Sequence, residues 1–335
     1  MKRPATGALI GLALGDALGK PTEFLRSTGR IEESYGPWRE LPLPTPALVT
    51  DDTDMTVAVA RALRTALGRG DLAPLRLTAP LREEYVAWAF RPQAGRAPGR
   101  TCLRAVALLT DEKRPWHDAS QLDSKGCGAN MRVAPIGLVP GLSDTRRSAA
   151  AQLQAALTHG HPTALAAADL TARAVHLLAR GTRPDDLVPE LIAYAQEQRR
   201  VYHRAWLGTL WLGTPNPSGE DYIEFGWDEC LKVLGWVDSA RHHADPESDP
   251  CVYTGEGWIA EEALATALLC FLLFPDEPLL AVRRAACTAG DSDSLACVTG
   301  ALAGAYLGAD AWPAEWADRV EFGEELRTFG AEWDA

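Results

Sequence analysis

The amino-acid sequence predicts an all-α fold, and three observations support this prediction. Apolar residues recur at helical spacing along most of the 335-residue chain. Runs that alternate between apolar and polar residues, which indicate half-buried strands, are scarce. Stretches rich in glycine and proline are short, and helical patterns resume promptly on both sides of them. We therefore expect many helices packed into one compact domain that spans residues 1–335.

The expected helices begin close to the start of the chain. Residues 7–19 follow Lys2 and Arg3, but this apolar run is short, contains Asp16 and lacks a convincing cleavage site. It is therefore expected to be a buried helix and not a signal peptide. The clearest pattern is in residues 163–179, where leucine and alanine lie mostly at helical spacing. The other expected helices cover residues 55–67, 100–109, 146–157, 187–198, 227–237, 257–274, 279–286 and 294–307.

Three polar loops are expected between these helices, at residues 91–99, 213–226 and 241–257. Each is rich in glycine, proline and polar residues, and none is expected to be a flexible linker between domains, because helical patterns resume promptly on both sides. No internal repeat or low-complexity tail is present. The apolar runs are too short to cross a membrane, so no membrane partner is expected.

Composition narrows the class of protein further. Hydrophobic residues make up 47% of the chain and charged residues 23%, which is ordinary for a globular protein. The net charge of −12 disfavours a broad nucleic-acid-binding face, but it leaves room for a small phosphate site built from backbone N–H groups. The seven cysteines are odd in number and form no C-x-x-C pair, which predicts reduced thiols in a cytoplasmic protein.

The stretch VTDDTDM, which starts at residue 49, concentrates negative charge at the front of an expected helix. One capping acid or hydroxyl stabilises a helix by about 1 kcal/mol, and acids in the first turn suit the helix dipole. Capping therefore explains one or two of these residues. It does not explain why Asp51 and Asp52 are adjacent and follow Thr50, since adjacent carboxylates repel and need a counter-charge. Thr53 and Asp54 are expected to serve as the cap and in the first turn.

A second acidic cluster opens the expected helix near residue 294. Asp291, Asp293 and Ser294 follow Gly290 and again combine two carboxylates with a hydroxyl. Such oxygen ligands suit Mg²⁺ or Mn²⁺. Two clusters could hold two ions, and a bridging water would then become a nucleophile near neutral pH. Spacing alone leaves helix capping as the alternative, because the clusters are far apart in the chain.

The stretch KGCGANMRVAPIGL, from residue 125, offers a candidate phosphate loop. Gly126 and Gly128 permit close approach of a ligand to the backbone, and a following helix would present free N–H groups. The alternative is a tight turn before a helix. The pattern is neither a Walker A motif nor a dinucleotide fingerprint. Cys127 lacks a histidine partner at a fixed spacing, which disfavours a nucleophilic role.

Other polar residues carry little signal alone. Glu23 follows the first helix, where a lone glutamate is usually solvated. His159 is a lone loop histidine, which is more often structural or exposed than catalytic. His242 and His243, with Asp245 nearby, could suggest a zinc site. No further ligand follows at the spacing that zinc sites show, so these residues are expected to be ordinary loop residues.

Taken together, five stretches resemble the ADP-ribosylglycohydrolase family, which includes the dinitrogenase reductase-activating glycohydrolase and hydrolases of ADP-ribosyl-arginine and ADP-ribosyl-serine. They match the family's opening helix, first metal motif, glycine-rich loop, histidine segment and second metal motif, in that order along nearly the whole chain. The stretches are GALIGLALGDALGKPTEF, TDDTDM, GCGANMRVAPIGL, LTHGHP and AGDSDSLACVTGALAGAYLGAD.

The resemblance implies a single all-α domain with a central cleft that holds two divalent cations, Mg²⁺ or Mn²⁺. Glu23 would lie beside the ions as a ligand or as the acid–base group, and Asp51 or Asp52 could share the deprotonation of water. The family usually has threonine at the last ligand position, and Ser294 keeps the hydroxyl oxygen. The implied metal ligands are Thr50, Asp51, Asp52, Asp291, Asp293 and Ser294.

The resemblance also implies an ADP-ribose cleft. Lys125 is a departure, because the serine-linkage branch tends to carry an aromatic residue there that stacks on adenine. Adenine is therefore expected to be held differently from the serine-linkage branch. The residues implied to line the cleft are Ser124, Gly126, Cys127, Gly128, Asn130 and Met131, with His159 nearby.

The implied activity is metal-dependent hydrolysis at C1″ of the distal ribose, which removes ADP-ribose from modified proteins. Two alternatives remain open: hydrolysis of an ADP-ribosylated small molecule or nucleic acid on the same fold, and a non-catalytic ADP-ribose-binding or structural relative. The net charge weighs against nucleic acid. The intact ligand set favours an enzyme. The acceptor linkage is not readable, since variable loops such as residues 91–99 and 213–226 would contact the acceptor.

Overall fold

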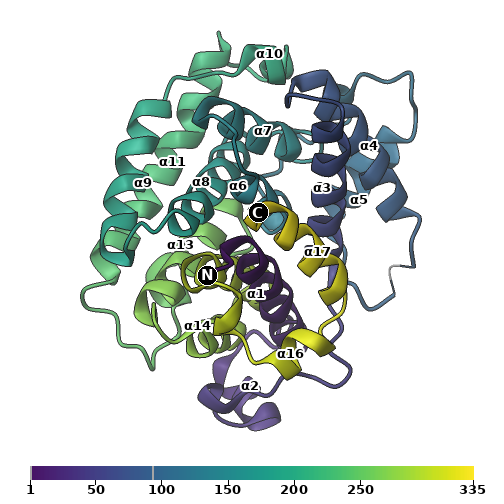
Figure 1. Ribbon diagram of the computed structural model, residues 1–335. Helices are drawn as coiled ribbons and strands as arrows, with labels where there is room; N and C mark the ends of the chain where they lie inside the picture. The colour runs from purple at the N-terminus through teal and green to yellow at the C-terminus, as the bar shows by residue number, and fades with distance from the viewer. Residues whose placement is uncertain (1, 93) are drawn as a thin grey trace.

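The computed structural model describes residues 2–92 and 94–335, and within them the chain is built from helices joined by loops (Figure 1). No β-strand occurs among these residues, where two isolated bridges join Gln121 to His159 and Gly126 to Ile259. The predicted all-α fold is therefore confirmed. The α-helices are α1 Pro4–Gly19, α2 Thr28–Tyr35, α3 Asp51–Gly68, α4 Pro74–Ala89, α5 Arg100–Leu109, α6 Ala134–Leu138, α7 Asp144–Ala156, α8 Pro162–Ala179, α9 Pro184–Gln198, α10 Arg204–Leu207, α11 Gly219–Ala240, α12 Cys251–Thr254, α13 Ala260–Leu273, α14 Pro278–Ala286, α15 Ser292–Leu307, α16 Ala314–Arg319 and α17 Gly323–Asp334.

Helix α1 is the helix around which the fold is assembled, and it packs chiefly against α15. Its glycines lie against the α15 backbone: a Cβ atom on Gly11 would stand 2.3 Å from the Gly300 oxygen, and one on Gly15 1.9 Å from the Ala296 oxygen. Only glycine permits such an approach. Every α1 residue after Pro4 is buried, as expected for a buried helix.

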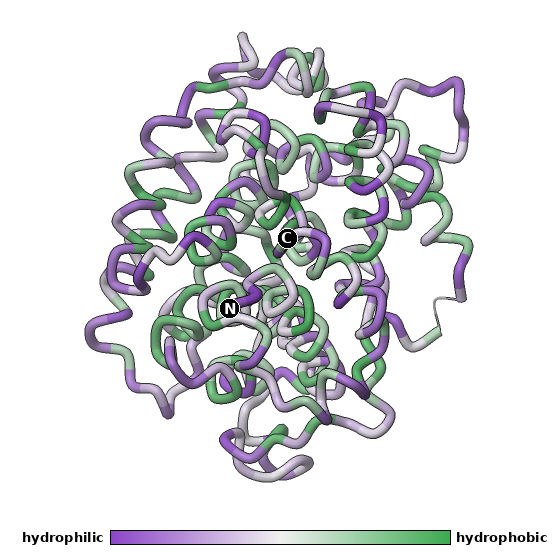
Figure 2. The backbone as a smooth tube through the Cα atoms, viewed as in Figure 1, coloured by the Kyte–Doolittle hydropathy of each residue, from purple (hydrophilic) through white to green (hydrophobic). Residues whose placement is uncertain are grey.

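Helices from the middle and the C-terminal part of the chain pack against this pair. Helix α17 packs along α1, and Asp334 accepts hydrogen bonds from the backbone N–H groups of Ala5 and Thr6 at 2.8 and 3.0 Å. Helices α8, α13 and α14 pack against α15. Figure 2 shows hydrophobic segments in the interior helices and hydrophilic segments along the outer loops. None of the helices in the described chain is both long enough and apolar enough to span a membrane.

The expected loop at residues 213–226 is wrong in its second half, because α11 begins at Gly219. Ser218 caps this helix by accepting a hydrogen bond from the Asp221 N–H at 3.0 Å, and Glu220 and Asp221 lie in the first turn. The polar residues that suggested a loop therefore start a helix. The expected loop at residues 241–257 likewise contains the short helix α12.

Several helices were not predicted, and α4 shows why. It contains Pro80 in its interior, and an interior proline weakens a helical pattern. Its buried face is nevertheless helical in spacing, with Leu77, Leu81, Tyr85 and Trp88 against the core. Tertiary packing of this face outweighs the poor local propensity.

Candidate functional site

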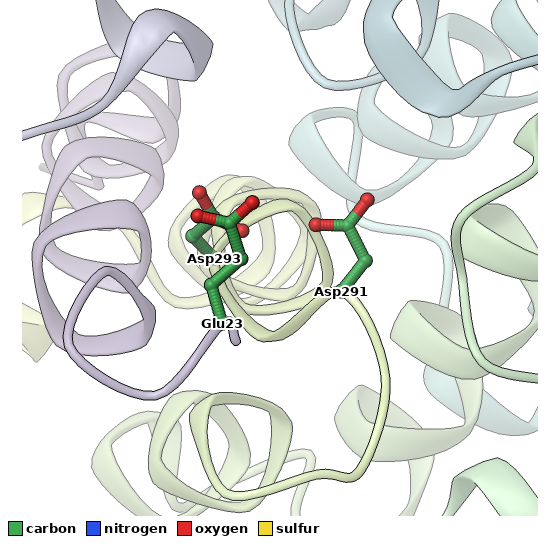
Figure 3. Close-up of side chains that lie close together, drawn as sticks. All are labelled: Glu23, Asp291 and Asp293. Atoms are coloured by element: carbon green, nitrogen blue, oxygen red, sulfur yellow. The ribbon is translucent and has the colours of Figure 1, made fainter. Parts of the chain in front are cut away.

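Carboxylates from opposite ends of the chain meet where α1, α3 and α15 come together. Glu23, which follows α1, and Asp291 and Asp293 at the start of α15 each offer an oxygen, and the three oxygens lie within 4.8 Å of one another. Figure 3 shows Asp291 on one side and Glu23 and Asp293 on the other. Asp51 and Asp52 line the same cleft from the start of α3. The two predicted acidic clusters therefore do meet in space.

The start of α3 is held by polar side chains. Thr50 is the N-cap, and its hydroxyl accepts a hydrogen bond from the Asp52 N–H at 3.3 Å. Asp16, on α1, accepts from the Thr50 N–H at 2.9 Å and from the N–H and hydroxyl of Thr53 at 3.0 and 2.5 Å. The expectation that Thr53 caps this helix is wrong, because the helix starts at Asp51 and Thr50 is the N-cap. Asp54 lies in the first turn, as expected, and pairs with Arg91.

The start of α15 is held mainly by the backbone. The Asp291 N–H donates to the Glu256 oxygen at 2.8 Å, and no side chain caps the helix. A Cβ on Gly290 would lie 2.0 Å from that same oxygen, which explains the glycine. The Ser294 N–H donates to Asp293 Oδ1 at 3.0 Å.

Burial and mutual repulsion raise the pKa values of these carboxyls. Burial first, and then the charges of Asp293 and Asp51, raise the pKa of Glu23 from its ordinary 4.5 to about 9. Burial and then Asp293 likewise raise the pKa values of Asp51, Asp52 and Asp291 well above their ordinary range. Protons or bound cations must therefore neutralise these buried carboxylates if the protein is to stay folded.

The site also offers an oxygen that is ready for a ligand. Asp52 Oδ2 is buried and has no hydrogen-bond partner, which is costly unless something else binds it. Hard carboxylate oxygens that converge with a free, buried acceptor fit a divalent cation such as Mg²⁺ or Mn²⁺. The residues present therefore fit the metal that the family resemblance implies.

The cleft beside these carboxylates has a volume of about 200 Å³. Thr50 is fully buried and does not line it. Cys102 and Trp258 also line it, and the Arg26 guanidinium lies 5.1 Å from the Trp258 ring centre. The predicted residues that line this cleft are Glu23, Asp51, Asp52, Gly126, Cys127, Gly128, Met131, His159, Asp291, Asp293 and Ser294.

The glycine-rich loop forms one wall. Its backbone is tied to the segment before α13, since the Cys127 N–H donates to the Trp258 oxygen at 3.3 Å and the Ala260 N–H to the Lys125 oxygen at 2.8 Å. A Cβ on Gly128 would lie 3.0 Å from the His159 ring, so glycine lets the loop rest on the imidazole. The helix expected next is only a short turn here, because α6 starts at Ala134 and has five residues.

Two predicted cleft residues lie outside the cleft lining. The Asn130 side chain is buried, donates to the Ala260 oxygen at 3.2 Å and accepts from the Thr171 hydroxyl at 2.6 Å. Ser124 instead lines an adjoining cavity of about 290 Å³, and its hydroxyl lies 2.8 Å from that of Thr101. Thr101 lines both cavities, so the two adjoin there.

His159 and Lys125 both have structural partners. The His159 Nδ1 atom lies 2.8 Å from the Thr158 hydroxyl, and burial, followed by the charge of Arg132, lowers the pKa of His159 to about 3. It is therefore neutral at physiological pH. Lys125 forms an ion pair with Glu261 at the start of α13.

Sequence reasoning missed Asp16 and Trp258. Asp16 is the one charged residue in the buried helix α1, and this isolation was its signal, because a buried acid needs polar partners. Trp258 carried no signal, since nothing in its local sequence places it beside the glycine loop.

Comparisons with known proteins agree with this geometry. The family model for ADP-ribosylglycohydrolase matches residues 2–333. The ADP-ribosyl-[dinitrogen reductase] glycohydrolase of Rhodospirillum rubrum is 27% identical over 323 residues, which cover 95% of this chain and 90% of that protein. The human ADP-ribosylhydrolase ARH3 is 28% identical over 352 residues, with 95% and 89% covered.

Two further comparisons concern a bacterial hydrolase and a solved structure. The ADP-ribosylarginine hydrolase Tri1 of Serratia proteamaculans is 26% identical over 326 residues, which cover 94% of this chain and 75% of that protein. A solved chain of an ADP-ribosylglycohydrolase-related protein complex is 25% identical and aligns over 99% of this chain and 98% of its own, with a TM-score of 0.67. The chain therefore belongs to the ADP-ribosylglycohydrolase family and is a glycosidic-bond hydrolase.

Proposed function

We propose that this protein hydrolyses the bond at C1″ of the distal ribose of ADP-ribosyl groups and depends on divalent cations. One observation carries this proposal: the cleft joins the acidic start of α3 to that of α15, with Glu23 between them. A structural protein has no need for so many buried, mutually repelling carboxylates. The intact set likewise weighs against a non-catalytic relative.

Two cations, Mg²⁺ or Mn²⁺, are proposed to bind between the two helix starts. When bound, they supply positive charge that orients ribose hydroxyls and lowers the pKa of a water molecule. The proposed ligands are Thr50, Asp51, Asp52, Asp291, Asp293 and Ser294.

Glu23 is proposed to accept the proton of the attacking water, aided by Asp51 or Asp52. Its carboxyl lines the cleft together with both aspartates, within the group of oxygens that would surround the anomeric carbon. In this arrangement, cations replace one of the paired carboxylates used by ordinary glycosidases.

The remainder of the substrate is proposed to extend from the cleft over Thr101. A volume of about 200 Å³ is smaller than the 300–1,000 Å³ typical of ligand pockets, so it suits one sugar better than a whole ADP-ribose. The Gly126–Gly128 backbone would bind the diphosphate, and Ser124 would contact the part that reaches the adjoining cavity.

The proposed substrate is an ADP-ribosylated protein. The relatives named above, which act on dinitrogen reductase or ADP-ribosylarginine by their names, support this choice. An ADP-ribosylated small molecule is the second candidate, because the small cleft itself makes no demand on the acceptor. Nucleic acid is disfavoured by the net charge of −12. We propose a cytoplasmic location, since all seven cysteines are free.

The test compares Asp51→Ala and Asp293→Ala with the wild-type protein. ADP-ribose release is measured on arginine-, serine- and nucleotide-linked substrates, each with Mg²⁺ or Mn²⁺ and with EDTA. Both variants and EDTA are expected to abolish release. Asp54→Ala is the matched control, because Asp54 lies in the same helical turn but pairs with Arg91. Full activity in both variants would overturn the two-metal proposal.

A further inference from the structure

A cysteine thiol faces the carboxylate centre. Cys127 Sγ lies 2.8 Å from Asp291 Oδ2, to which it donates a hydrogen bond, and 3.6 Å from the Ser294 hydroxyl. Cys127 lines the cleft with both of these residues. Its sulfur is therefore adjacent to two of the proposed metal ligands, and it contributes a soft donor to an otherwise hard set of oxygens.

The loop fixes the backbone of Cys127. The Cys127 N–H donates to the Trp258 oxygen at 3.3 Å, and its own oxygen accepts from the N–H groups of Asn130 and Met131 at 2.6 and 3.1 Å. The flanking glycines rest against His159. From this fixed backbone position the thiol reaches Asp291.

A second, independent observation indicates that this place receives a ligand. Asp52 is 2% exposed and lines the same cleft, yet its Oδ2 atom has no hydrogen-bond partner. Glu23, Asp291 and Asp293 line this cleft too, and one oxygen from each lies within 4.8 Å of the others. The sulfur thus borders a set of acceptors that is incomplete without a cation.

We propose that Cys127 is itself a metal ligand, and that it shifts the preference of the centre from Mg²⁺ towards thiophilic divalent cations such as Co²⁺, Zn²⁺ and Cd²⁺. This inference rests on the proposed metal centre. When such an ion binds, the S–H bond breaks, a sulfur–metal bond forms and the proton leaves to solvent. Mg²⁺ gains nothing from the sulfur, because it takes oxygen ligands and retains waters.

Another cysteine in the same cleft provides a matched control. Cys102 Sγ lies 3.6 Å from the Arg132 guanidinium, Nη1, and therefore faces a positive charge. A cation is not expected beside it. The two thiols differ in the sign of the charge they face, and only Cys127 is predicted to bind metal.

The experiment adds Co²⁺ or Mg²⁺ to the metal-depleted full-length chain. Binding is measured by calorimetry, and the sulfur-to-cobalt charge-transfer band is followed in the near ultraviolet. We expect the band in the wild-type protein and in Cys102→Ala, and not in Cys127→Ser or Cys127→Ala. Cys127→Ser is expected to bind Co²⁺ at least about tenfold more weakly, while its Mg²⁺ affinity stays within about twofold. Circular dichroism establishes that each variant is folded.

The outcomes separate this inference from the proposed function. Co²⁺ binding to the wild-type protein without the band would overturn the role of Cys127 and leave the metal centre standing. The same holds if the band persists in both Cys127 variants. Failure of the wild-type protein to bind Mg²⁺, Mn²⁺ and Co²⁺ would overturn the metal centre and this inference together.

Discussion

The helix starts of α3 and α15, which form the proposed metal centre, each carry two carboxylates and a hydroxyl. They are held in place differently. Thr50 caps α3 with its hydroxyl, and Asp16 accepts three further hydrogen bonds there. Helix α15 has no side-chain cap, and its position depends on the backbone bond from Asp291 to Glu256 and on close packing against α1. The α3 half is thus positioned by side-chain hydrogen bonds, and the α15 half by a backbone hydrogen bond and close helix packing.

Both clusters were expected to open helices, but only at α3 does a capping side chain mark the start of the helix. A threonine before acids is a capping pattern, so the α3 cluster is expected to be placed by local rules. The α15 cluster depends on glycines in a distant helix. A Cβ on Gly19 would lie 2.4 Å from the Asp293 Cα, so α1 directly sets the position of a proposed ligand.

The largest effect is expected from substitutions that remove one carboxylate charge from the start of α3 or of α15. Asp52→Asn and Asp293→Asn are each expected to lower kcat/KM by at least about 100-fold, because a lost ligand should cost more than a lost outer-shell partner. Hydrolysis of ADP-ribosylated protein measures this. Asp54→Asn should change activity little, since Asp54 is paired with Arg91. An active Asp52→Asn beside an inactive Asp293→Asn would mean that α15 alone carries the centre.

The next effect is the pH dependence of stability without metal. The pKa of Glu23 is raised from 4.5 to about 9 and that of Asp16 from 3.8 to about 7, chiefly by burial. Between each pair of values the folded protein holds a proton that the unfolded chain has released, so the free energy of unfolding falls as pH rises. Thermal unfolding of the EDTA-treated protein from pH 4 to 9 measures this slope.

Added Mn²⁺ should flatten that slope, because the cation replaces the protons as the neutralising charge. Glu23→Gln should remove the part nearest pH 9, and Asp16→Asn the part below about pH 7. A metal-free protein whose stability rises over this range would contradict the burial of these carboxyls.

A smaller effect is expected from substitutions that test the close packing of α1 against α15. Gly15→Ala and Gly300→Ala each place a methyl group about 2 Å from the facing backbone and are expected to destabilise the protein by about 1–3 kcal/mol. Gly235→Ala is the matched control. Gly235 lies in α11 with no other atom near its Cβ position, so alanine should stabilise by up to about 1 kcal/mol. Urea unfolding measures all three, and equal effects at the three sites would refute the role of close packing.

The smallest effect separates the two hydroxyls. Thr50→Ala should cost about 1 kcal/mol of unfolding free energy, because it removes the α3 cap. Ser294→Ala should cost less, since Ser294 caps nothing, while both variants weaken metal binding. Ser294→Thr should keep both the stability of the protein and its metal binding, because threonine retains the hydroxyl. If Ser294→Ala destabilised the protein as much as Thr50→Ala, the contrast between the halves would be lost.

Sequence reasoning succeeded where a local rule applied. The helix at residues 100–109 has the predicted bounds, and the all-α class followed from periodicity. It failed at α11, because Ser218 and Asp221 are as typical of helix starts as of loops. It also failed at α4, where Pro80 lies inside a helix that tertiary packing stabilises.

The site was predictable in residue types but not in arrangement. Spacing indicated two acidic clusters, yet only the family resemblance brought them together and added Glu23, which is buried where a lone glutamate is usually solvated. A signal was present in α1, whose glycines recur every four residues from Gly7 to Gly19 and thus form one flat face. The hydrogen bonds of Asn130 within the fold depend on tertiary contacts that no local pattern encodes.

The pairing of α1 with α15 has a consequence for how the chain is made. Roughly 270 residues separate the end of α1 from the start of α15, so a ribosome needs roughly 15–55 s to supply the partner. During that time the glycine face of α1 has nothing to pack against and is open to chaperones. A chain released before Asp291 still contains Thr50–Asp52, but it lacks the second half of the proposed metal centre. Full assembly of the cleft therefore requires that synthesis has passed Ser294.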